Sequence, residues 1–210
     1  MSGEKTFDHS RYYAKFASAC AKNISEKDCS KYFKRYDPEL PRIEKILGML
    51  KAIRPSTILD IGSGRGRSLW PMVCAFSECD FTCIDPFAWR ARVINAVGIE
   101  VGCLKAFEAD ACDMRIFADN SFDVVTALEV FEHIPDVERA VKEVVRVAKN
   151  FVIISVPSKP DENPDHIHFL PFKKLSSMLL DSGKRIAKLT EGYTLQSMQV
   201  LVRFKNGKDA

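Results

Sequence analysis

The sequence lacks any apolar run that approaches the roughly 20 residues a membrane-spanning helix needs. Its start, Met-Ser-Gly-Glu-Lys, lacks the apolar stretch of a secretory signal. The seven cysteines are odd in number and contain no Cys-x-x-Cys pair, which argues against a disulfide framework. We therefore expect a cytoplasmic protein with reduced, mostly buried thiols and no membrane partner.

Dense runs of charge and internal repeats are absent as well. The 210 residues suit one domain, and fractions of 46% hydrophobic and 28% charged residues are typical of a soluble globular protein. The net charge is +3, and the basic excess lies in residues 1–36 and 173–210. Basic ends around an acidic middle could attract an anionic substrate or nucleic acid. Because neither end carries a dense basic run, we favour the interpretation that this charge is solubilising surface.

Short apolar segments alternate with helical patterns from residue 56 onward. We expect strands at 57–61, 81–84, within 101–109, and at 122–128, 151–156, 184–189 and 195–204. We expect helices at 42–51, 67–76, 87–97, 137–148 and 172–180. This order predicts an α/β, doubly wound sheet with helices on both faces. Residues 1–40, polar with interleaved aromatics, predict an N-terminal helical cap or lid on a domain formed by 41–210.

A glycine-rich segment, Asp60-Ile61-Gly62-Ser63-Gly64-Arg65-Gly66, leaves the first predicted strand. Glycines let the backbone turn tightly and approach a ligand, and amides at a helix start attract anionic groups. A dinucleotide site requires a third glycine at 67, where the sequence has Arg67, and the Gly-Lys-Ser/Thr of a P-loop is also absent. The segment therefore predicts a ligand loop of another kind.

Acidic residues follow the next strands of the series. Asp85 comes 23 positions after Gly62, where a carboxylate can accept hydrogen bonds from ribose hydroxyls. Pro86 and Phe87 then offer apolar surface for adenine. Glu108-Ala109-Asp110-Ala111 follows the third strand, and the fourth strand leads into Glu129-x-x-Glu132-His133. All of these residues fall at carboxyl ends of strands, where ligands bind in doubly wound sheets.

Over residues 56–156 this order of motifs resembles the class I S-adenosylmethionine (SAM) dependent methyltransferases, with the glycine loop as their motif I. The resemblance implies a Rossmann-like, seven-stranded, mostly parallel sheet whose last strand is antiparallel. It also implies SAM as cofactor and S-adenosylhomocysteine as product. The cofactor-binding residues it implies are Asp60, Gly62, Ser63, Gly64, Arg65, Gly66, Asp85, Pro86, Asp110, Ala111 and Glu129.

Within that resemblance, Asp60 would hold the amino group of the cofactor, and Asp110 the adenine amino group. Glu108 and Asp113 are rivals for the role of Asp110, because the end of the third strand is not fixed by the sequence.

The expected reaction is methyl transfer from SAM to a small-molecule or short-peptide acceptor, mainly through proximity and in-line alignment. His133 is the candidate base and Glu132 a second catalytic candidate, although His133 could equally be structural. The acceptor pocket is expected from the N-terminal 40 residues and from the loop 158–171. Three aromatic residues could form a lid or the buried face of a cap helix: Tyr12, Tyr13 and Phe16.

Two alternatives remain beside this reading, which includes no metal. Glu129, Glu132 and His133, with His166 or His168, resemble the metal-binding set of the small-RNA 3′-terminal ribose 2′-O-methyltransferases. Carboxylates and imidazoles would suit a divalent cation. The other alternative is a SAM-binding protein without catalysis. The acceptor, the methylated atom and the oligomeric state are not indicated by the sequence.

Overall fold

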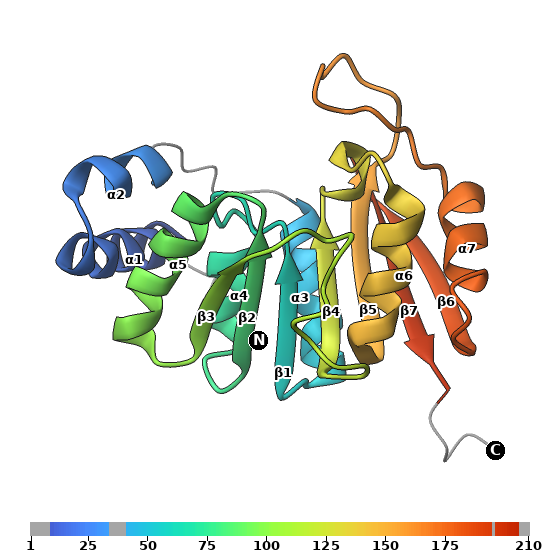
Figure 1. Ribbon diagram of the computed structural model, residues 1–210, viewed down its shortest axis with the longest axis horizontal. Helices are drawn as coiled ribbons and strands as arrows, with labels where there is room; N and C mark the ends of the chain where they lie inside the picture. Colours follow the sequence, from blue (N-terminus) through green and yellow to red (C-terminus); the bar gives the residue numbers. More distant parts are fainter. Residues whose placement is uncertain (1–8, 34–40, 195, 206–210) are drawn as a thin grey trace, which may run out of the picture.

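A seven-stranded sheet in the order β3-β2-β1-β4-β5-β7-β6 forms the centre of the protein (Figure 1). The computed structural model describes residues 9–33, 41–194 and 196–205, and only the backbone of residues 9–13 and 26. The strands are β1 (Thr57–Ile61), β2 (Asp80–Asp85), β3 (Leu104–Glu108), β4 (Phe122–Leu128), β5 (Ala148–Pro157), β6 (Ile186–Tyr193) and β7 (Ser197–Phe204). Only β7 runs antiparallel to its neighbours, β5 and β6. The predicted fold class and the antiparallel last strand are confirmed.

Helices cover both faces of the sheet, as predicted. They are α1 (His9–Asn23), α2 (Glu26–Tyr32), α3 (Pro41–Ile53), α4 (Leu69–Ala75), α5 (Ala88–Val101), α6 (Val137–Val147) and α7 (Phe172–Leu180), with a 3-10 turn, η1 (Phe131–His133). The helices α1 to α5 share one buried cluster with the sheet, and α6 and α7 share the other. None of the described helices is long and apolar enough to cross a membrane.

Successive side chains of the central strands pack alternately into these two buried clusters. Ile58 and Val124 pack on the side of α1 to α5, whereas their neighbours Leu59 and Val125 pack on the side of α6 and α7. Because successive side chains of a strand point to opposite faces, a strand between two helical layers must be apolar on both. This requirement explains the nearly continuous apolar runs in the sequence.

Most element boundaries differ by a few residues from the sequence-based expectation, and for two of them the structure shows the reason. The helix predicted over 87–97 continues to Val101, where Gly102 adopts the left-handed φ of 78° and ends it, so that β3 begins only at Leu104. Ala148, predicted as the last residue of a helix, instead begins β5 and pairs with Phe122. In both places the choice depends on a local backbone conformation that hydrophobic periodicity does not encode.

The N-terminal helices pack beside α5 at the β3 end of the sheet (Figure 1). Phe16 is buried, with its ring centroid 4.8 Å from that of Trp70, and Tyr32 is buried against the same indole. Phe16 thus belongs to the buried face of a cap helix, while the side chains of Tyr12 and Tyr13 lie outside the described residues. The division into 1–40 and 41–210 stays a prediction, because residues 34–40 are also outside them.

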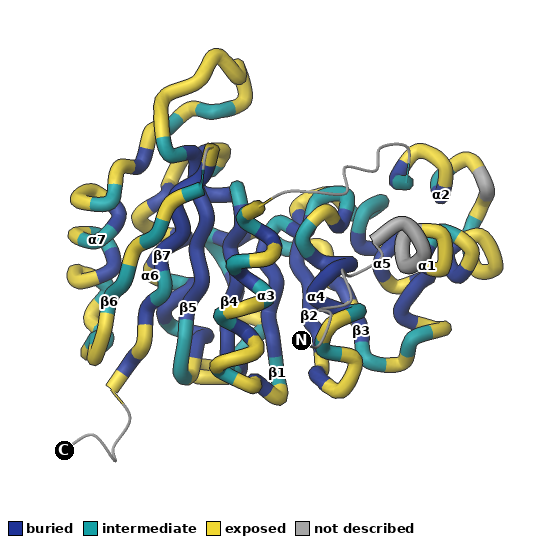
Figure 2. The backbone as a smooth tube through the Cα atoms, turned by 180° about the vertical axis from the view of Figure 1, so that it is seen from behind, coloured by how far each residue is buried: buried dark blue, intermediate teal, exposed yellow. Residues whose placement is uncertain are grey.

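The sheet changes direction of winding at β1, which lies between β2 and β4. The carboxyl ends of these strands meet at one edge, where α/β sheets of this kind bind ligands. The segment 158–171, between β5 and α7, rises above that edge in Figure 1, and Figure 2 shows its tip exposed. The fold therefore brings the predicted site residues to one edge beneath one long loop.

Replacing Phe16 with alanine tests whether the N-terminal helices share the core of the sheet. We expect the free energy of unfolding to fall by about 3–5 kcal/mol, because a buried phenylalanine leaves a large cavity. Equilibrium urea unfolding followed by tryptophan fluorescence and by circular dichroism should show one transition with both probes. Phe169→Ala, at a 40% exposed position, is the control and should change stability little. Two separate transitions would instead show an independent N-terminal unit.

Candidate functional site

The glycine loop after β1 is held in a conformation that only glycine adopts easily. Gly62, Gly64 and Gly66 have φ values of 64°, 55° and 73°, all left-handed. A Cβ on Gly66 would lie 2.1 Å from Nε1 of Trp70, and one on Gly62 would lie 2.8 Å from a methyl of Val130. The glycines are therefore required by packing as well as by the turn.

Two neighbouring cavities open on either side of this loop. The first, about 610 Å³, is lined by Arg42, Asp60, Ile61, Gly62, Ser63, Gly64, Arg65, Arg67, Ser68, Arg90, Leu128 and Glu129. The second, about 820 Å³, is lined by Ile61, Gly62, Gly64, Ile84, Asp85, Pro86, Phe87, Arg90, Ala109, Asp110, Ala111, Glu129, Val130, His133, Ile134, Pro135, Pro164, Asp165 and Ile167. Five residues line both, so the cavities adjoin at the glycine loop. The described part of α1 and α2 lines neither of them.

Asp60 lies buried at the floor of the first cavity. The hydroxyl of Thr126 donates a hydrogen bond of 2.7 Å to its carboxylate. Burial raises the pKa of Asp60 to about 6, although hydrogen bonds from Ser63 and Thr126 oppose the rise. A buried carboxylate with so little compensation is well suited to a cationic ligand group.

Asp85, at the end of β2, is already surrounded by donors. The backbone N–H groups of Gly64 and Phe87 donate to its two oxygens at 3.0 Å each. The guanidinium of Arg90 contacts both oxygens at 3.2 and 3.3 Å. Sequence reasoning did not anticipate Arg90, which also packs 4.5 Å from the Phe87 ring centroid. Ribose hydroxyls can reach Asp85 only if Arg90 moves, because the carboxylate has few free lone pairs left.

Three carboxylates after β3, those of Glu108, Asp110 and Asp113, are candidates for binding the adenine amino group. Asp110 and Ala111 line the second cavity, whereas Glu108 and Asp113 do not. One oxygen of Asp110 accepts the N–H of Cys112 at 2.8 Å, and Asp113 instead pairs with Arg115. Among these three carboxylates, only Asp110 faces the cavity.

Glu129 lies where the two cavities meet. Its φ of 58° is unusual for a residue with a side chain, and the Ser155 hydroxyl donates to its carboxylate. Its N–H also donates to the Ser155 carbonyl at 2.8 Å. The strained backbone turns the chain away from β4 and aims this side chain into the cavity floor.

Glu132, in η1, is fully buried, and neither of its carboxylate oxygens has a hydrogen-bond partner within the described structure. Burial is the main reason why its pKa rises to about 8, and the nearby charge of Glu129 adds to the rise while that of Arg42 opposes it. A buried acid without partners costs free energy. Such a group suggests a ligand or ion that would satisfy it.

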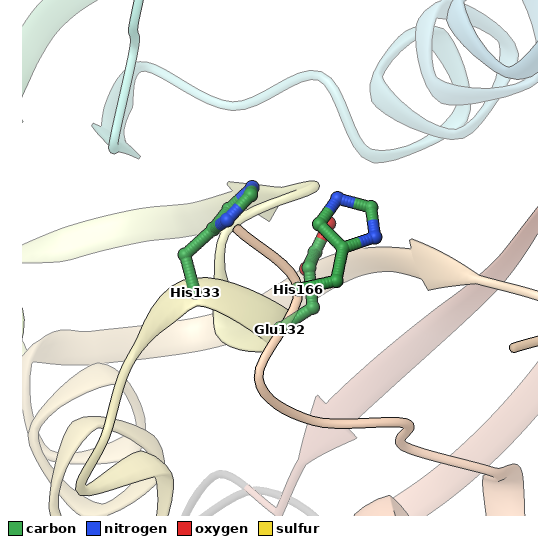
Figure 3. Close-up of side chains that lie close together, drawn as sticks. All are labelled: Glu132, His133 and His166. Carbon is green, nitrogen blue, oxygen red and sulfur yellow. The ribbon is translucent and has the colours of Figure 1, made fainter. Parts of the chain in front are cut away.

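Two imidazoles lie beside Glu132, as Figure 3 shows. One ligand atom from each of Glu132, His133 and His166 lies within 4.8 Å of the other two. Nδ1 of His133 is 2.8 Å from the Asp165 carbonyl, and Nδ1 of His166 is 2.8 Å from the Asp161 carboxylate. Both oxygens only accept, so each Nδ1 donates, and Nε2 is the ring nitrogen left for a metal ion.

The sequence left open whether His166 or His168 belongs to a metal-binding set, and this cluster distinguishes the two. His166 belongs to it, whereas Nε2 of His168 lies 3.2 Å from the Pro135 carbonyl. Glu129 also lies outside the three-residue cluster. The carbonyl of Glu132 accepts the N–H groups of Ile167 and His168, so the loop 158–171 is tied to η1 above the second cavity.

Comparison with known proteins identifies the domain. A family model described as a methyltransferase domain matches residues 59–154. The structure is similar to magnesium protoporphyrin IX methyltransferase from Synechocystis PCC 6803, solved with bound SAM, with a TM-score of 0.63, 14% identity, and coverage of 97% of this chain and 100% of that one. Residues 59–154 thus match a methyltransferase domain, and the fold around them is that of solved SAM-dependent methyltransferases. The prediction of SAM as cofactor is confirmed with it.

Curated relatives of this methyltransferase domain are only partly spanned by the chain. It is 32% identical over 123 residues to the uncharacterized methyltransferase YcgJ of Bacillus subtilis, covering 54% of this chain and 47% of that protein. It is 34% identical over 146 residues to the sterol 24-C-methyltransferase erg6 of Aspergillus fumigatus, covering 65% of this chain and 37% of that protein. The chain thus spans less than half the length of these two relatives.

Arginines are the main residues of the candidate site that sequence reasoning missed. Arg42, Arg67 and Arg90 line the first cavity together with Arg65, which was expected. The available signals were weak: Arg42 lies in the first turn of the helix before β1, and Arg90 lies five residues after Asp85. Neither position carries a motif, so their convergence depends on how α3 and α5 pack against the sheet.

Gly66→Ala should destabilise the domain by about 2–4 kcal/mol, since the new methyl group combines a left-handed φ with overlap on Trp70. Gly183→Ala is the matched control: its φ is 85°, but nothing lies within 4 Å of the added Cβ. That control should cost about 1–2 kcal/mol from the backbone alone. Equilibrium urea unfolding measures both, and equal losses would show that the Trp70 contact does not restrict this position.

Proposed function

We propose that the chain transfers a methyl group from SAM to a small-molecule acceptor. The observation that carries the proposal is the convergence of Asp60, Asp85, Asp110 and Glu129 on two adjoining cavities at the glycine loop. In this assignment the first cavity takes the methionine part of SAM and the second takes the adenosine part. Glycines 62, 64 and 66 let the backbone approach the cofactor closely.

Each acid has a distinct proposed task. Asp60 pairs with the cofactor ammonium, and Asp85 accepts the ribose hydroxyls once Arg90 has moved aside. Asp110 uses its second oxygen for the adenine amino group, with Ala111 and Pro86 beside the ring. Glu129, between the cavities, lies nearest to the sulfonium. These tasks match the charge and position of each residue, and they remain proposals for this chain.

Methyl transfer from SAM requires mainly that the protein align the acceptor with the transferred methyl group. The methyl of a sulfonium is already electrophilic, so holding the acceptor in line with it supplies most of the acceleration. Relatives named for sterols, tocopherol and magnesium protoporphyrin act on small molecules. The loop 158–171, with Pro164, Asp165 and Ile167 on the second cavity, would form the acceptor side of the site. A short peptide is the alternative acceptor.

Cofactor binding should weaken in acid because Asp60 has a pKa of about 6 in the free protein. A bound ammonium favours the ionised carboxylate, so affinity is full above pH 6 and falls as the pH drops through it. Calorimetric titration with S-adenosylhomocysteine should give a Kd about tenfold weaker at pH 5 than at pH 7. Asp60→Asn should weaken binding about ten- to a hundredfold at pH 7 and remove the pH dependence.

Asp113→Asn is the control for this titration, because Asp113 lies outside both cavities and pairs with Arg115. It should leave both the Kd and its pH dependence unchanged. Absence of S-adenosylhomocysteine binding at any pH would overturn the proposed function. Binding without product formation, when labelled SAM is supplied with a small-molecule extract, would favour the non-catalytic alternative.

We also propose a divalent cation held by Glu132, His133 and His166. The supporting observation is the buried carboxylate without partners beside two imidazoles whose Nδ1 atoms are held by oxygen acceptors. This arrangement is typical of histidine ligands, whose free nitrogen is oriented by a hydrogen bond at the other one. A cation there would act as a Lewis acid toward an acceptor oxygen. No described feature favours RNA over another acceptor.

Cobalt binding to the purified protein tests this second proposal. The wild type should bind one Co²⁺ per chain and show visible absorption bands. Loss of a residue that only hydrogen-bonds to a metal ligand weakens metal binding about ten- to hundredfold. Because His166 is proposed as a ligand itself, His166→Ala should weaken Co²⁺ binding by more than that. His168→Ala, in the same loop but outside the cluster, should bind as the wild type does. Equal loss in both variants, or no binding by the wild type, would contradict the site.

A further inference from the structure

The first cavity carries more positive charge than its residues or its cofactor can balance. Four guanidinium groups line it, from Arg42, Arg65, Arg67 and Arg90, against the carboxylates of Asp60 and Glu129. Arg90 is paired with Asp85 in this structure, and it would lose that partner on moving aside for the cofactor ribose. Within the described ranges, no ion pair involves any of the other three arginines.

The cofactor makes this excess larger. SAM has one carboxylate, one ammonium and a cationic sulfonium, so its carboxylate can pair with only one of Arg42, Arg65 and Arg67. Its ammonium is assigned to Asp60, and the sulfonium adds a further positive charge beside Glu129. At least two of these guanidinium groups, from the half-buried Arg42 and Arg65 and the exposed Arg67, then remain without an anionic partner along a cavity of about 610 Å³.

We propose that the methyl acceptor carries an oxyanion, a carboxylate or a phosphate, which binds to two of the guanidinium groups of Arg42, Arg65 and Arg67. This inference rests on the proposed methyltransferase function and names its substrate class. The planar guanidinium presents paired N–H donors that match an oxyanion, and the basic lining also attracts anions from solution. A neutral sterol-like acceptor would leave these charges unbalanced.

The position of Arg42 shows how such an acceptor would lie. Arg42 is in the first turn of α3, half-buried, and its Nε is buried without a partner. It lies close enough to Glu132 for its charge to act on that carboxyl group. An oxyanion at the arginines would therefore anchor one end of the acceptor, and the remainder would extend past the sulfonium toward Glu132 and His133.

Calorimetry on the protein saturated with S-adenosylhomocysteine tests the inference. Saturation fills the cofactor carboxylate position, so any further anion must use the remaining arginines. Titrations with inorganic phosphate and with benzoate distinguish the two kinds of oxyanion. We expect one of them to bind at one site per chain with a Kd on the order of 1–10 mM, as befits an isolated fragment.

Single replacements of the three arginines by glutamine then identify the site. The cofactor carboxylate accounts for one arginine at most, so at least two of Arg42→Gln, Arg65→Gln and Arg67→Gln should bind S-adenosylhomocysteine within threefold of the wild type. Those two should bind the anion at least fivefold more weakly. Arg92→Gln is the matched control, because Arg92 is exposed on α5 and lines neither cavity.

The outcomes separate this inference from the function on which it rests. Failure of S-adenosylhomocysteine to bind would overturn the proposed function itself. Normal S-adenosylhomocysteine binding with neither anion bound would overturn only the oxyanion class. An equal loss in Arg92→Gln would show adventitious attraction to surface charge and would also overturn it. Weaker binding of either phosphate or benzoate in the arginine variants, but not in Arg92→Gln, would support the inference. The anion affected would identify the acid group of the acceptor.

Discussion

The left-handed glycine loop at the end of β1 is the constraint on which the site depends. Its three positive φ values turn the chain so tightly that Trp70 and Val130 occupy the space where side chains would stand. The same turn directs the Gly64 N–H to Asp85 and that of Gly62 to the Ile84 carbonyl, which joins the loop to β2. One backbone conformation thus places the loop on the border of both cavities and positions Asp60 in the lining of the first.

Buried ionisable groups mark the places where this rigid edge is incomplete without a ligand. Asp60 and Glu132 are both withdrawn from water, and burial raises the pKa of each, to about 6 and about 8. Thr126 compensates Asp60 in part, whereas Glu132 has no partner within the described structure. Stability alone would favour apolar or amide side chains at both positions. Their presence fits groups that receive an ammonium in the first cavity, at Asp60, and a cation or proton beside η1, at Glu132.

The sequence was sufficient for the alternation of strands and helices along the chain and for placing the acids at the carboxyl ends of strands, because these follow from periodicity and from the carboxyl-edge rule of doubly wound sheets. It could not place the contacts made between elements. The pairing of Arg90 with Asp85 depends on the first turn of α5, and the choice between His166 and His168 depends on how one exposed loop folds back over η1. The pattern of apolar and polar residues along the chain predicts neither of these contacts. For the histidines it cannot, since both lie in the same short segment.

The charge and polarity of the two cavities together indicate which kind of acceptor the site would bind. A cationic cofactor beside unpaired guanidinium groups makes the first cavity strongly positive, while the wall formed by Ile134, Pro135 and Ile167 makes the mouth of the second largely apolar. An acceptor with an acid at one end and an apolar body would satisfy both environments at once, whereas a wholly apolar one would have to leave the arginines hydrated. Because hydrated arginines would hold water next to the sulfonium, an anionic acceptor would also exclude that water from the transferred methyl group. Two of the guanidinium groups of Arg42, Arg65 and Arg67 would then select the substrate and exclude water from the reaction site in the same binding event.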